Sequence, residues 1–96
     1  MIQFKNLIVN LDEKTCTLND TEVKLTKTEF NLLVFLLSNR NKIYSRKELM
    51  QNVWQETTVT GRAVDTTIAR LRKKLSDISK HIITRTQFGY GFKEDV

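Results

Sequence analysis

The segment GRAVDTTIARLRKKL, residues 61–75, constrains the fold of this chain more than any other stretch. Its four large aliphatic residues recur at intervals of three and four positions: Val64, Ile68, Leu71 and Leu75. At 100° per residue they fall within a stripe about 60° wide, as expected of a helix with one buried face. The spacing therefore predicts a helix over residues 62–75 that packs on a core formed by the rest of the chain.

The opposite face of this predicted helix is basic and carries a hydroxyl group. It consists of Arg62, Thr66, Ala69, Arg70 and Lys73. A solvated helix usually mixes charges of both signs, with Glu placed four residues before Lys, and this helix contains no Glu. A basic helix suits the major groove of DNA, which is wide enough to admit one. The alternative is a cationic helix that only keeps the protein in solution.

The rest of the chain changes from a strand-like to a helix-like pattern near residue 26. Segments 1–10, 13–19 and 21–25 are rich in Val, Ile, Thr and Phe, which predicts three short strands of an antiparallel sheet. Two capping boxes, Thr26–Glu29 and Ser45–Glu48, each precede an apolar run and predict the starts of two helices. The first helix is expected to end near residues 38–39.

The C-terminal half continues with a loop, the helix already described and a hairpin. Segment 55–60 is polar and β-branched, so it is predicted to be a loop, and Thr60 or a neighbour is expected to cap the third helix. Segment 81–93 predicts a β-hairpin, with Gly89 at a tight turn or bulge. Tyr90 and Phe92 are expected in the core of that hairpin. The element order is therefore strands, three helices and a hairpin.

Length and charge narrow the class of protein. Ninety-six residues allow one domain with a modest core. Residues 1–30 carry four Lys and five acidic residues, whereas residues 31–96 carry twelve Lys or Arg and six acidic residues. A basic segment favours a polyanionic partner, usually nucleic acid, although it also serves solubility. The N-terminus lacks a signal-peptide pattern and no apolar run reaches membrane-spanning length, so we expect a cytoplasmic protein.

The residues that could support catalysis or metal binding are few. The single Cys16 and the single His81 are too few for a disulfide or a zinc site. Ser45 is interpreted as a helix cap rather than a nucleophile, because no general base lies at catalytic spacing. We therefore expect no enzyme activity, no cofactor and no metal, and structural roles for Cys16 and His81.

Four segments together carry the pattern of a known family: LTKTEFNLL (25–33), IYSRKELMQNVW (43–54), RAVDTTIARLRKKL (62–75) and GYGF (89–92). Their order and spacing, across essentially the whole chain, resemble the winged helix-turn-helix DNA-binding domain of OmpR/PhoB-type response regulators. The resemblance implies an α+β fold in one domain, residues 1–96. It would comprise an N-terminal four-stranded antiparallel sheet, a three-helix bundle and a C-terminal β-hairpin wing. The fourth strand is expected either near residues 23–25 or from a split of the first segment.

The function implied by the resemblance is sequence-specific binding of double-stranded DNA. The chain would be the effector domain of a bacterial two-component transcription regulator, with helix 62–75 in the major groove and the wing, 82–93, toward the minor groove. The family binds direct-repeat sites as a tandem dimer. Its phosphorelay runs from a sensor kinase through a receiver domain that this chain lacks. The chain is then either a fragment, which we expect, or an effector domain that stands alone. Segment 55–61 matches the part that touches RNA polymerase in activators. The alternative is a winged-helix protein-interaction module without DNA binding.

The resemblance also assigns contacts to individual residues. Thr66 and Arg70 match positions that face bases. The phosphate contacts that it implies are Trp54, Arg62, Thr67, Arg72 and Thr84. Trp54 can serve equally as a core residue, and Lys73 and Lys74 are candidates for phosphate or solvent. Asp65 is expected to pair with an Arg or to cap the helix, since DNA would repel it.

The predicted wing departs from the family pattern T-V-R-G-x-G-Y. Its arginine, Arg85, comes one position early and so falls on the opposite face of the strand by simple alternation. Arg85 and Thr86 are retained as candidate DNA contacts. Either Arg85 reaches around the strand to the DNA, or the wing contributes less to binding than it does in the family. Phe88 is unusual for a solvated tip and is a candidate for contact with a sugar or a neighbouring subunit.

Overall fold

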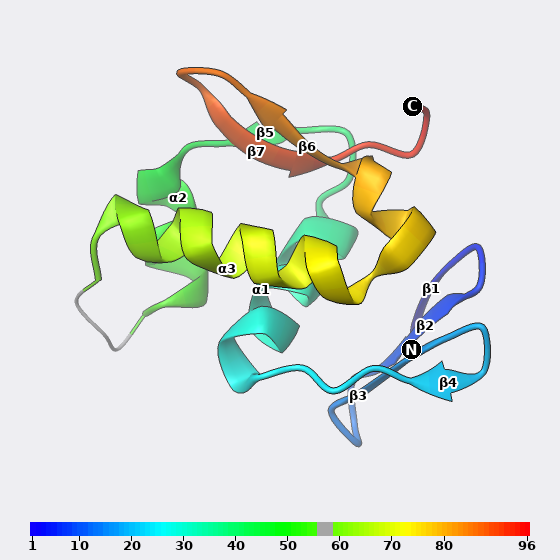
Figure 1. The fold of residues 1–96 in the computed structure, drawn as a ribbon. Coiled ribbons are helices and arrows are strands. Elements are labelled where there is room, and N and C mark those ends of the chain that lie inside the picture. Colours follow the sequence, from blue (N-terminus) through cyan, green and yellow to red (C-terminus); the bar gives the residue numbers. More distant parts are fainter. Residues whose placement is uncertain (56–58) are drawn as a thin grey trace.

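The computed structural model describes residues 1–55 and 59–96, and it begins with an antiparallel sheet of four short strands (Figure 1). In sheet order these are β1 (Ile2–Phe4), β2 (Leu7–Asn10), β3 (Thr15–Leu18) and β4 (Thr21–Glu22). The predicted first strand is split at Lys5, which has φ 53° and turns the chain back on itself. The fourth strand therefore comes from that split, which was one of its two expected origins.

The first two helices begin where the capping boxes predict. They are α1 (Lys27–Ser38) and α2 (Arg46–Val53). The Thr26 hydroxyl accepts from the Glu29 N–H at 3.1 Å, and the Thr26 N–H donates to the Glu29 carboxylate at 2.9 Å. Ser45 and Glu48 repeat the arrangement at 3.1 and 2.8 Å. Each box satisfies two N–H groups that a helix start leaves without partners.

The third helix, α3 (Gly61–Lys74), begins one residue before its predicted start. Thr60 occupies the N-cap position, but its side chain makes no capping hydrogen bond, so the predicted cap is wrong in that respect. A short 3₁₀ helix, η1 (Ser76–His81), follows α3, in a segment for which the sequence predicted no element. Figure 1 shows α3 crossing the front of the molecule, with α1 behind it.

The C-terminal hairpin consists of β6 (Ile82–Arg85) and β7 (Gly89–Phe92), and it gains a third strand. β5 (Ile43–Tyr44), which the sequence did not predict, pairs with β7 on the side opposite β6. A Cβ atom at Gly89 would collide with the Tyr44 carbonyl, and one at Gly91 with the Lys42 carbonyl. The two glycines of the GYGF motif therefore allow β5 to approach β7 closely.

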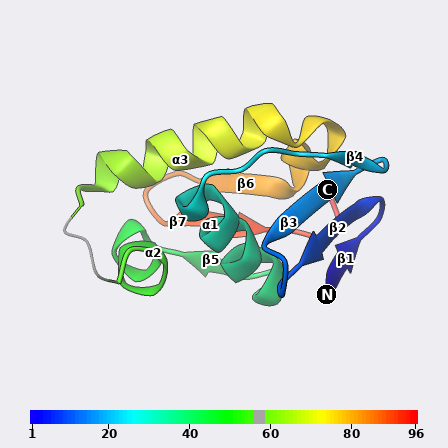
Figure 2. The same ribbon diagram turned by 90° about the horizontal axis from the view of Figure 1, so that it is seen from below.

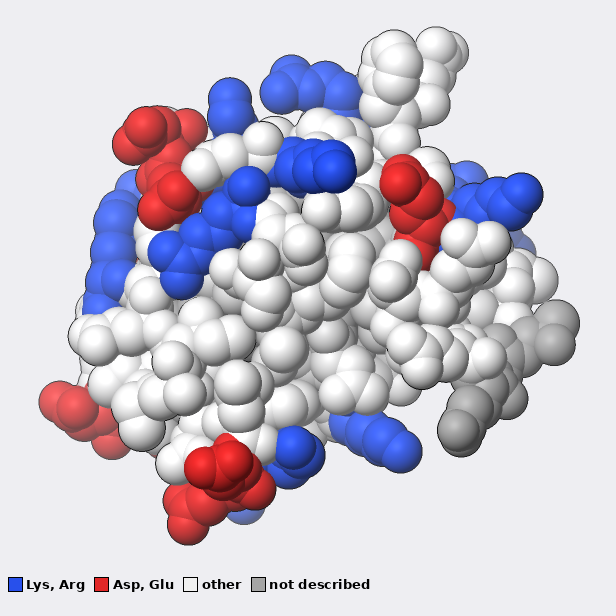
Figure 3. Space-filling view, turned by 180° about the vertical axis from the view of Figure 1, so that it is seen from behind, with Lys and Arg blue, Asp and Glu red and all other residues white. Residues whose placement is uncertain are grey.

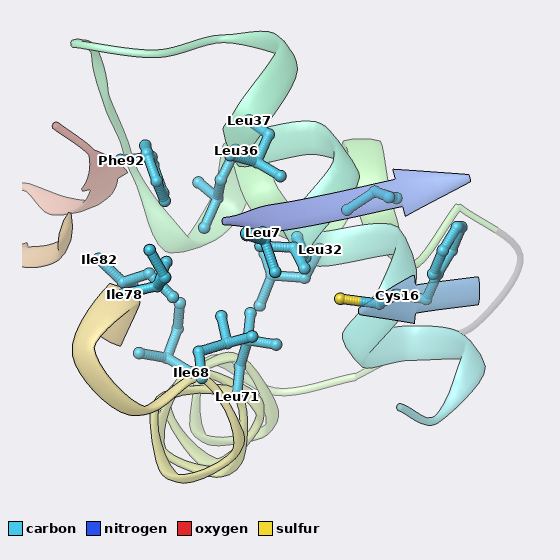
Figure 4. Close-up of a cluster of buried hydrophobic side chains, with 14 of the residues drawn as sticks. Leu7, Cys16, Leu32, Leu36, Leu37, Ile68, Leu71, Ile78, Ile82 and Phe92 are labelled. Atoms are coloured by element: carbon cyan, nitrogen blue, oxygen red, sulfur yellow. The ribbon is translucent and has the colours of Figure 1, made fainter. Parts of the chain in front are cut away.

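One contiguous core joins these elements (Figure 4). Leu7 and Cys16 enter it from the N-terminal sheet, Leu32 and Leu36 from α1, and Phe92 from the hairpin. The predicted stripe of α3 is fully buried there: Val64, Ile68, Leu71 and Leu75. Each such side chain contributes about 1.5–3 kcal/mol relative to exposure, so burial of this apolar face is a major part of what holds α3 on the core.

The arrangement of the layers leaves the other face of α3 open. Figure 2 shows α3 along one side of the molecule, with the N-terminal sheet near its C-terminal end. The tip of the β6–β7 hairpin points toward the opposite end, where α3 begins and α2 lies (Figures 1 and 2). No helix within residues 1–55 and 59–96 combines the length and apolar character needed to cross a membrane.

Candidate nucleic-acid interface

The outer face of α3 is exposed as predicted. Its exposed residues are Arg62, Thr66, Ala69, Arg70 and Lys73. Within residues 1–55 and 59–96, none of the ion pairs involves a side chain of this face, so no carboxylate offsets the charge of its three cations. The opposite side of the molecule has a largely uncharged centre, with Lys, Arg, Asp and Glu near its edges (Figure 3). Among the described residues, the basic charge of α3 that forms no ion pair therefore lies on the face that no other element covers.

Asp65, the one acidic residue of α3, is neutralised by the protein itself. The Arg46 guanidinium donates to both carboxylate oxygens, at 3.0 and 2.5 Å, and the Tyr90 hydroxyl donates to one of them at 2.5 Å. The expected pairing of Asp65 with an Arg is thus confirmed. The contact joins α2, α3 and β7, and such two-bond Arg–carboxylate pairs are geometrically specific. It also removes a charge that would repel a polyanion.

Tyr90 differs from its predicted role as a hairpin core residue. Phe92 is fully buried, but Tyr90 is only partly buried because its hydroxyl reaches Asp65. Burial, the hydrogen bond to Asp65 and the negative charge of that carboxylate together raise the pKa of Tyr90. The phenol therefore stays protonated at neutral pH and keeps donating its hydrogen bond.

Arg72 fastens the hairpin to α3. Its guanidinium donates to the Ile82 carbonyl, at 3.1 and 2.6 Å, and to the Thr84 hydroxyl at 2.8 Å. The same group lies over the Tyr90 ring, 6.0 Å from the ring centroid. Arg72 and Thr84 were both predicted as phosphate contacts, and the structure brings them together. Two nitrogens of Arg72 donate hydrogen bonds within the protein, so the main role of Arg72 is to fix the position of β6 relative to α3.

Two other predicted contacts on α3 face the protein. Thr67 is only 9% exposed, and its hydroxyl donates to the Ala63 carbonyl at 2.8 Å. A hydroxyl has one proton, so in this state Thr67 has none to offer a phosphate. Lys74, considered for phosphate or solvent, instead pairs with the buried Glu29 at 2.7 Å. At 100° per residue both residues fall beside the apolar stripe of α3, and the Lys74–Glu29 pair shows that this flank meets α1.

The Glu29 carboxylate is only 2% exposed. Burial by itself would raise its pKa, but the hydrogen bonds from Lys74 and from the Thr26 backbone, with the positive charge of Lys74, outweigh burial and lower it. The group is therefore ionised at neutral pH, and it connects the start of α1 to the end of α3. That link helps to fix the orientation of α3 on the bundle.

Trp54 stands at the end of α2 with its ring half-buried against the core. Its backbone N–H donates to the Met50 carbonyl at 3.0 Å. The predicted polymerase segment, 55–61, includes residues 56–58, which lie outside the described part of the chain. Residues 56–58 are flanked by Trp54 and Gln55 on one side and by Val59 and Thr60 on the other.

The hairpin presents Thr84, Arg85 and Thr86 to solvent. A hollow of about 510 Å³ lies between the hairpin tip and the start of α2, and Arg46, Lys47 and Arg85 are among the residues that line it. Arg46 and Lys47 were not among the contacts predicted from the sequence. The signal was present, since two consecutive basic residues begin α2 in the segment SRKEL.

Cys16 and His81 occupy interior positions. Burial raises the pKa of the Cys16 thiol to about 11, so the thiol stays protonated and unreactive at neutral pH. His81 is buried against the rings of Phe4 and Phe92, with Nδ1 2.7 Å from the Lys93 carbonyl and Nε2 3.3 Å from the Lys5 ammonium. Both positions agree with the expected structural roles.

Comparison with known proteins places this geometry in a family. Residues 20–92 match the family described as "Transcriptional regulatory protein, C terminal". The chain is 39% identical, over 97% of its length, to the transcriptional regulatory protein ResD of Bacillus subtilis, and 37% identical over its full length to SrrA of Staphylococcus aureus. It spans 41% of the length of these relatives.

Solved structures agree with the sequence relatives. The DNA-binding domain of Klebsiella pneumoniae RstA, in complex with the RstA box, has a TM-score of 0.84 and 32% identity, covering 97% of this chain and 96% of that one. Thermotoga maritima DrrB, an OmpR/PhoB homologue, has a TM-score of 0.85 and 34% identity, covering 95% of this chain and 43% of that one. The predicted winged-helix fold is therefore confirmed. The chain belongs to the OmpR/PhoB-type family of C-terminal DNA-binding domains of transcriptional response regulators.

Proposed function

We propose that this chain binds double-stranded DNA with α3 in the major groove, as the effector domain of a two-component transcription regulator. The observation that carries the proposal is the outer face of α3, whose three cations have no protein partner among the described residues. The one carboxylate of that helix is held by Arg46 and Tyr90. A surface with a neutralised Asp65, and with cations that are unpaired among the described residues, is complementary to a polyanion. A protein-interaction module has no such requirement, so DNA binding explains this surface better.

The exposed positions divide into two roles. Arg70, near the middle of the face, is long enough for a bidentate pair with a guanine, while Thr66 suits a thymine methyl group. The side chains proposed to meet phosphates are Arg62 and Lys73 on α3, Thr84, Arg85 and Thr86 on the hairpin, and Trp54 through its indole N–H. Arg46 and Lys47, which line the hollow, join them. Thr67 and Arg72 contribute indirectly: Thr67 packs within the protein, and Arg72 holds the hairpin against α3.

Larger assemblies follow from the same proposal. We infer tandem binding of two copies on direct repeats, contact of segment 55–61 with RNA polymerase, and control by a sensor kinase through a receiver domain elsewhere in the protein. Two structures of similar proteins support the DNA part of this proposal. RstA is bound to the RstA box, and the AdeR DNA-binding domain is bound to an intercistronic region.

The test compares Arg70→Ala with Arg62→Ala, after selection of a preferred site from random duplexes. Fluorescence anisotropy measures the affinity of each protein for that site and for single-base variants, at several salt concentrations. Arg70→Ala should lose about 1–3 kcal/mol of discrimination at one base pair. Arg62→Ala should weaken all duplexes alike and reduce the log–log salt slope by about one.

The two variants serve as controls for each other, since both remove one exposed cation from the same helix. Identical behaviour would show that the division into base and phosphate contacts is wrong. If the wild-type domain fails to bind any duplex at low salt, DNA binding itself is wrong, and the protein-interaction reading takes its place.

A further inference from the structure

The tip of the β6–β7 hairpin exposes an aromatic side chain. Phe88 is 69% exposed, and the other large apolar residues exposed to this degree in the described chain are the terminal Met1 and Val96. The Phe88 N–H donates to the Arg85 carbonyl at 2.9 Å, and Gln87 has φ 71°, so a tight turn presents the ring. Single exposed apolar residues are common on proteins, so the surroundings of the ring carry the argument.

Those surroundings are cationic. Phe88 lines the hollow of about 510 Å³ together with Arg46, Lys47 and Arg85. All three basic side chains are exposed, and only Arg46 forms an ion pair among the described residues. No acidic residue is among those that line the hollow. The ring therefore stands beside a cavity that attracts negative charge.

The charge around Phe88 restricts the partner that can cover it. A second copy of this chain carries a net charge of +5, and the cations of the hollow would oppose its approach. A DNA strand offers the opposite combination, because its charged phosphates alternate with deoxyribose rings that carry apolar C–H groups. A surface that pairs free cations with an exposed aromatic ring is complementary to that alternation of charged and apolar groups.

We propose that Phe88 packs on a deoxyribose of the DNA backbone while adjoining phosphates are drawn into the hollow by Lys47 and Arg85. The inference rests on the proposed DNA binding and adds a contact to it. The hairpin then supplies an apolar part of the affinity that releases no counterions. This contribution comes from the uncharged Phe88, whereas the neighbouring Arg85 contributes through its charge.

Salt dependence separates this contact from an electrostatic one. The experiment measures affinity for a short random-sequence duplex that holds one domain, across a range of salt concentrations, for the wild type, Phe88→Ala, Phe88→Tyr and Arg85→Ala. Phe88→Ala should bind about fivefold more weakly with an unchanged log–log slope, because burying part of a ring is an apolar contribution. Phe88→Tyr keeps the ring and should bind as the wild type does. Arg85→Ala should lower the slope by about one.

Several results would overturn the inference. Wild-type affinity in Phe88→Ala would show that the ring touches nothing. A slope that falls in Phe88→Ala as it does in Arg85→Ala would show that Phe88 only positions the arginine. A loss seen only on a duplex long enough for two domains would assign the contact to a second copy. Absence of wild-type binding at low salt would mark failure of the proposed function instead. Thermal unfolding of Phe88→Ala should match the wild type, since the ring is exposed.

Discussion

The pair between Lys74 and Glu29 gives the sharpest prediction about stability. In Lys74→Met the buried Glu29, a residue only 2% exposed, keeps its hydrogen bond from Thr26 but loses the one cation that pairs with it among the described residues. Removing one partner of a buried charge costs about 3–5 kcal/mol when both groups are buried. The Lys74 side chain is 36% exposed, so water already screens part of the interaction. We therefore expect a loss of about 2 kcal/mol of unfolding free energy, within the range for hydrogen bonds to charged groups.

Urea unfolding at pH 7 measures that loss, and a domain of this size should also melt about 8–16 °C lower. Lys73→Met is the matched control, because Lys73 is the exposed neighbour and makes no ion pair among the described residues. It should leave stability unchanged and lower the salt slope of DNA binding, whereas Lys74→Met should do the reverse. Equal stability of the two variants would refute the assignment of Lys74 to the fold.

The Lys74–Glu29 pair also makes the unfolding free energy depend on pH. Folding lowers the Glu29 pKa, so the pair contributes fully above the ordinary carboxyl pKa of about 4.3 and is lost as pH falls through the lower folded value. The stability difference between wild type and Lys74→Met should therefore shrink below about pH 4. A difference that stays constant from pH 7 to pH 3 would contradict this account.

Two further substitutions test how the hairpin is held. Gly91→Ala places a methyl group against the Lys42 carbonyl, directly before β5, and should lower the melting temperature. Gly61→Ala meets only the flexible end of Arg46 and should be close to neutral in a thermal melt. Arg72→Lys cannot bridge the two hairpin acceptors as a guanidinium does, so amide hydrogens of β6 should exchange faster and all duplexes should bind more weakly. Arg70→Lys should leave that exchange unchanged, and equal exchange in both variants would refute the bridging role.

Much of the fold could be predicted because its signals are local. A capping box needs only four consecutive residues, and both boxes, Thr26–Glu29 and Ser45–Glu48, form as predicted. The buried stripe of α3 repeats within a single helix, so its spacing alone identifies the hidden face. The exposed face follows by elimination, which is why the basic surface of α3 was also predicted correctly.

The parts that could not be predicted depend on residues far apart in the chain. β5 has only two residues and forms because glycines nearly fifty positions later let its backbone approach β7. Glu29 and Lys74 are separated by 45 positions, and nothing near Lys74 indicates a buried partner. Arg72 resembles a free cation until the hairpin brings the Ile82 carbonyl within reach. In each case a tertiary contact decides what the side chain does.

The hydrogen bonds of α3 have a consequence for how such a domain can change over evolutionary time. Side chains that hold the helix in place, Asp65, Thr67 and Arg72, alternate along it with side chains that make no hydrogen bond within the described residues. Thr66, Ala69 and Arg70 belong to the second kind. Substitutions there leave the bonds between helix, hairpin and bundle intact. With the base contacts proposed for Thr66 and Arg70, a duplicated copy of this domain can therefore acquire a new preferred DNA sequence one residue at a time, without passing through an unstable intermediate.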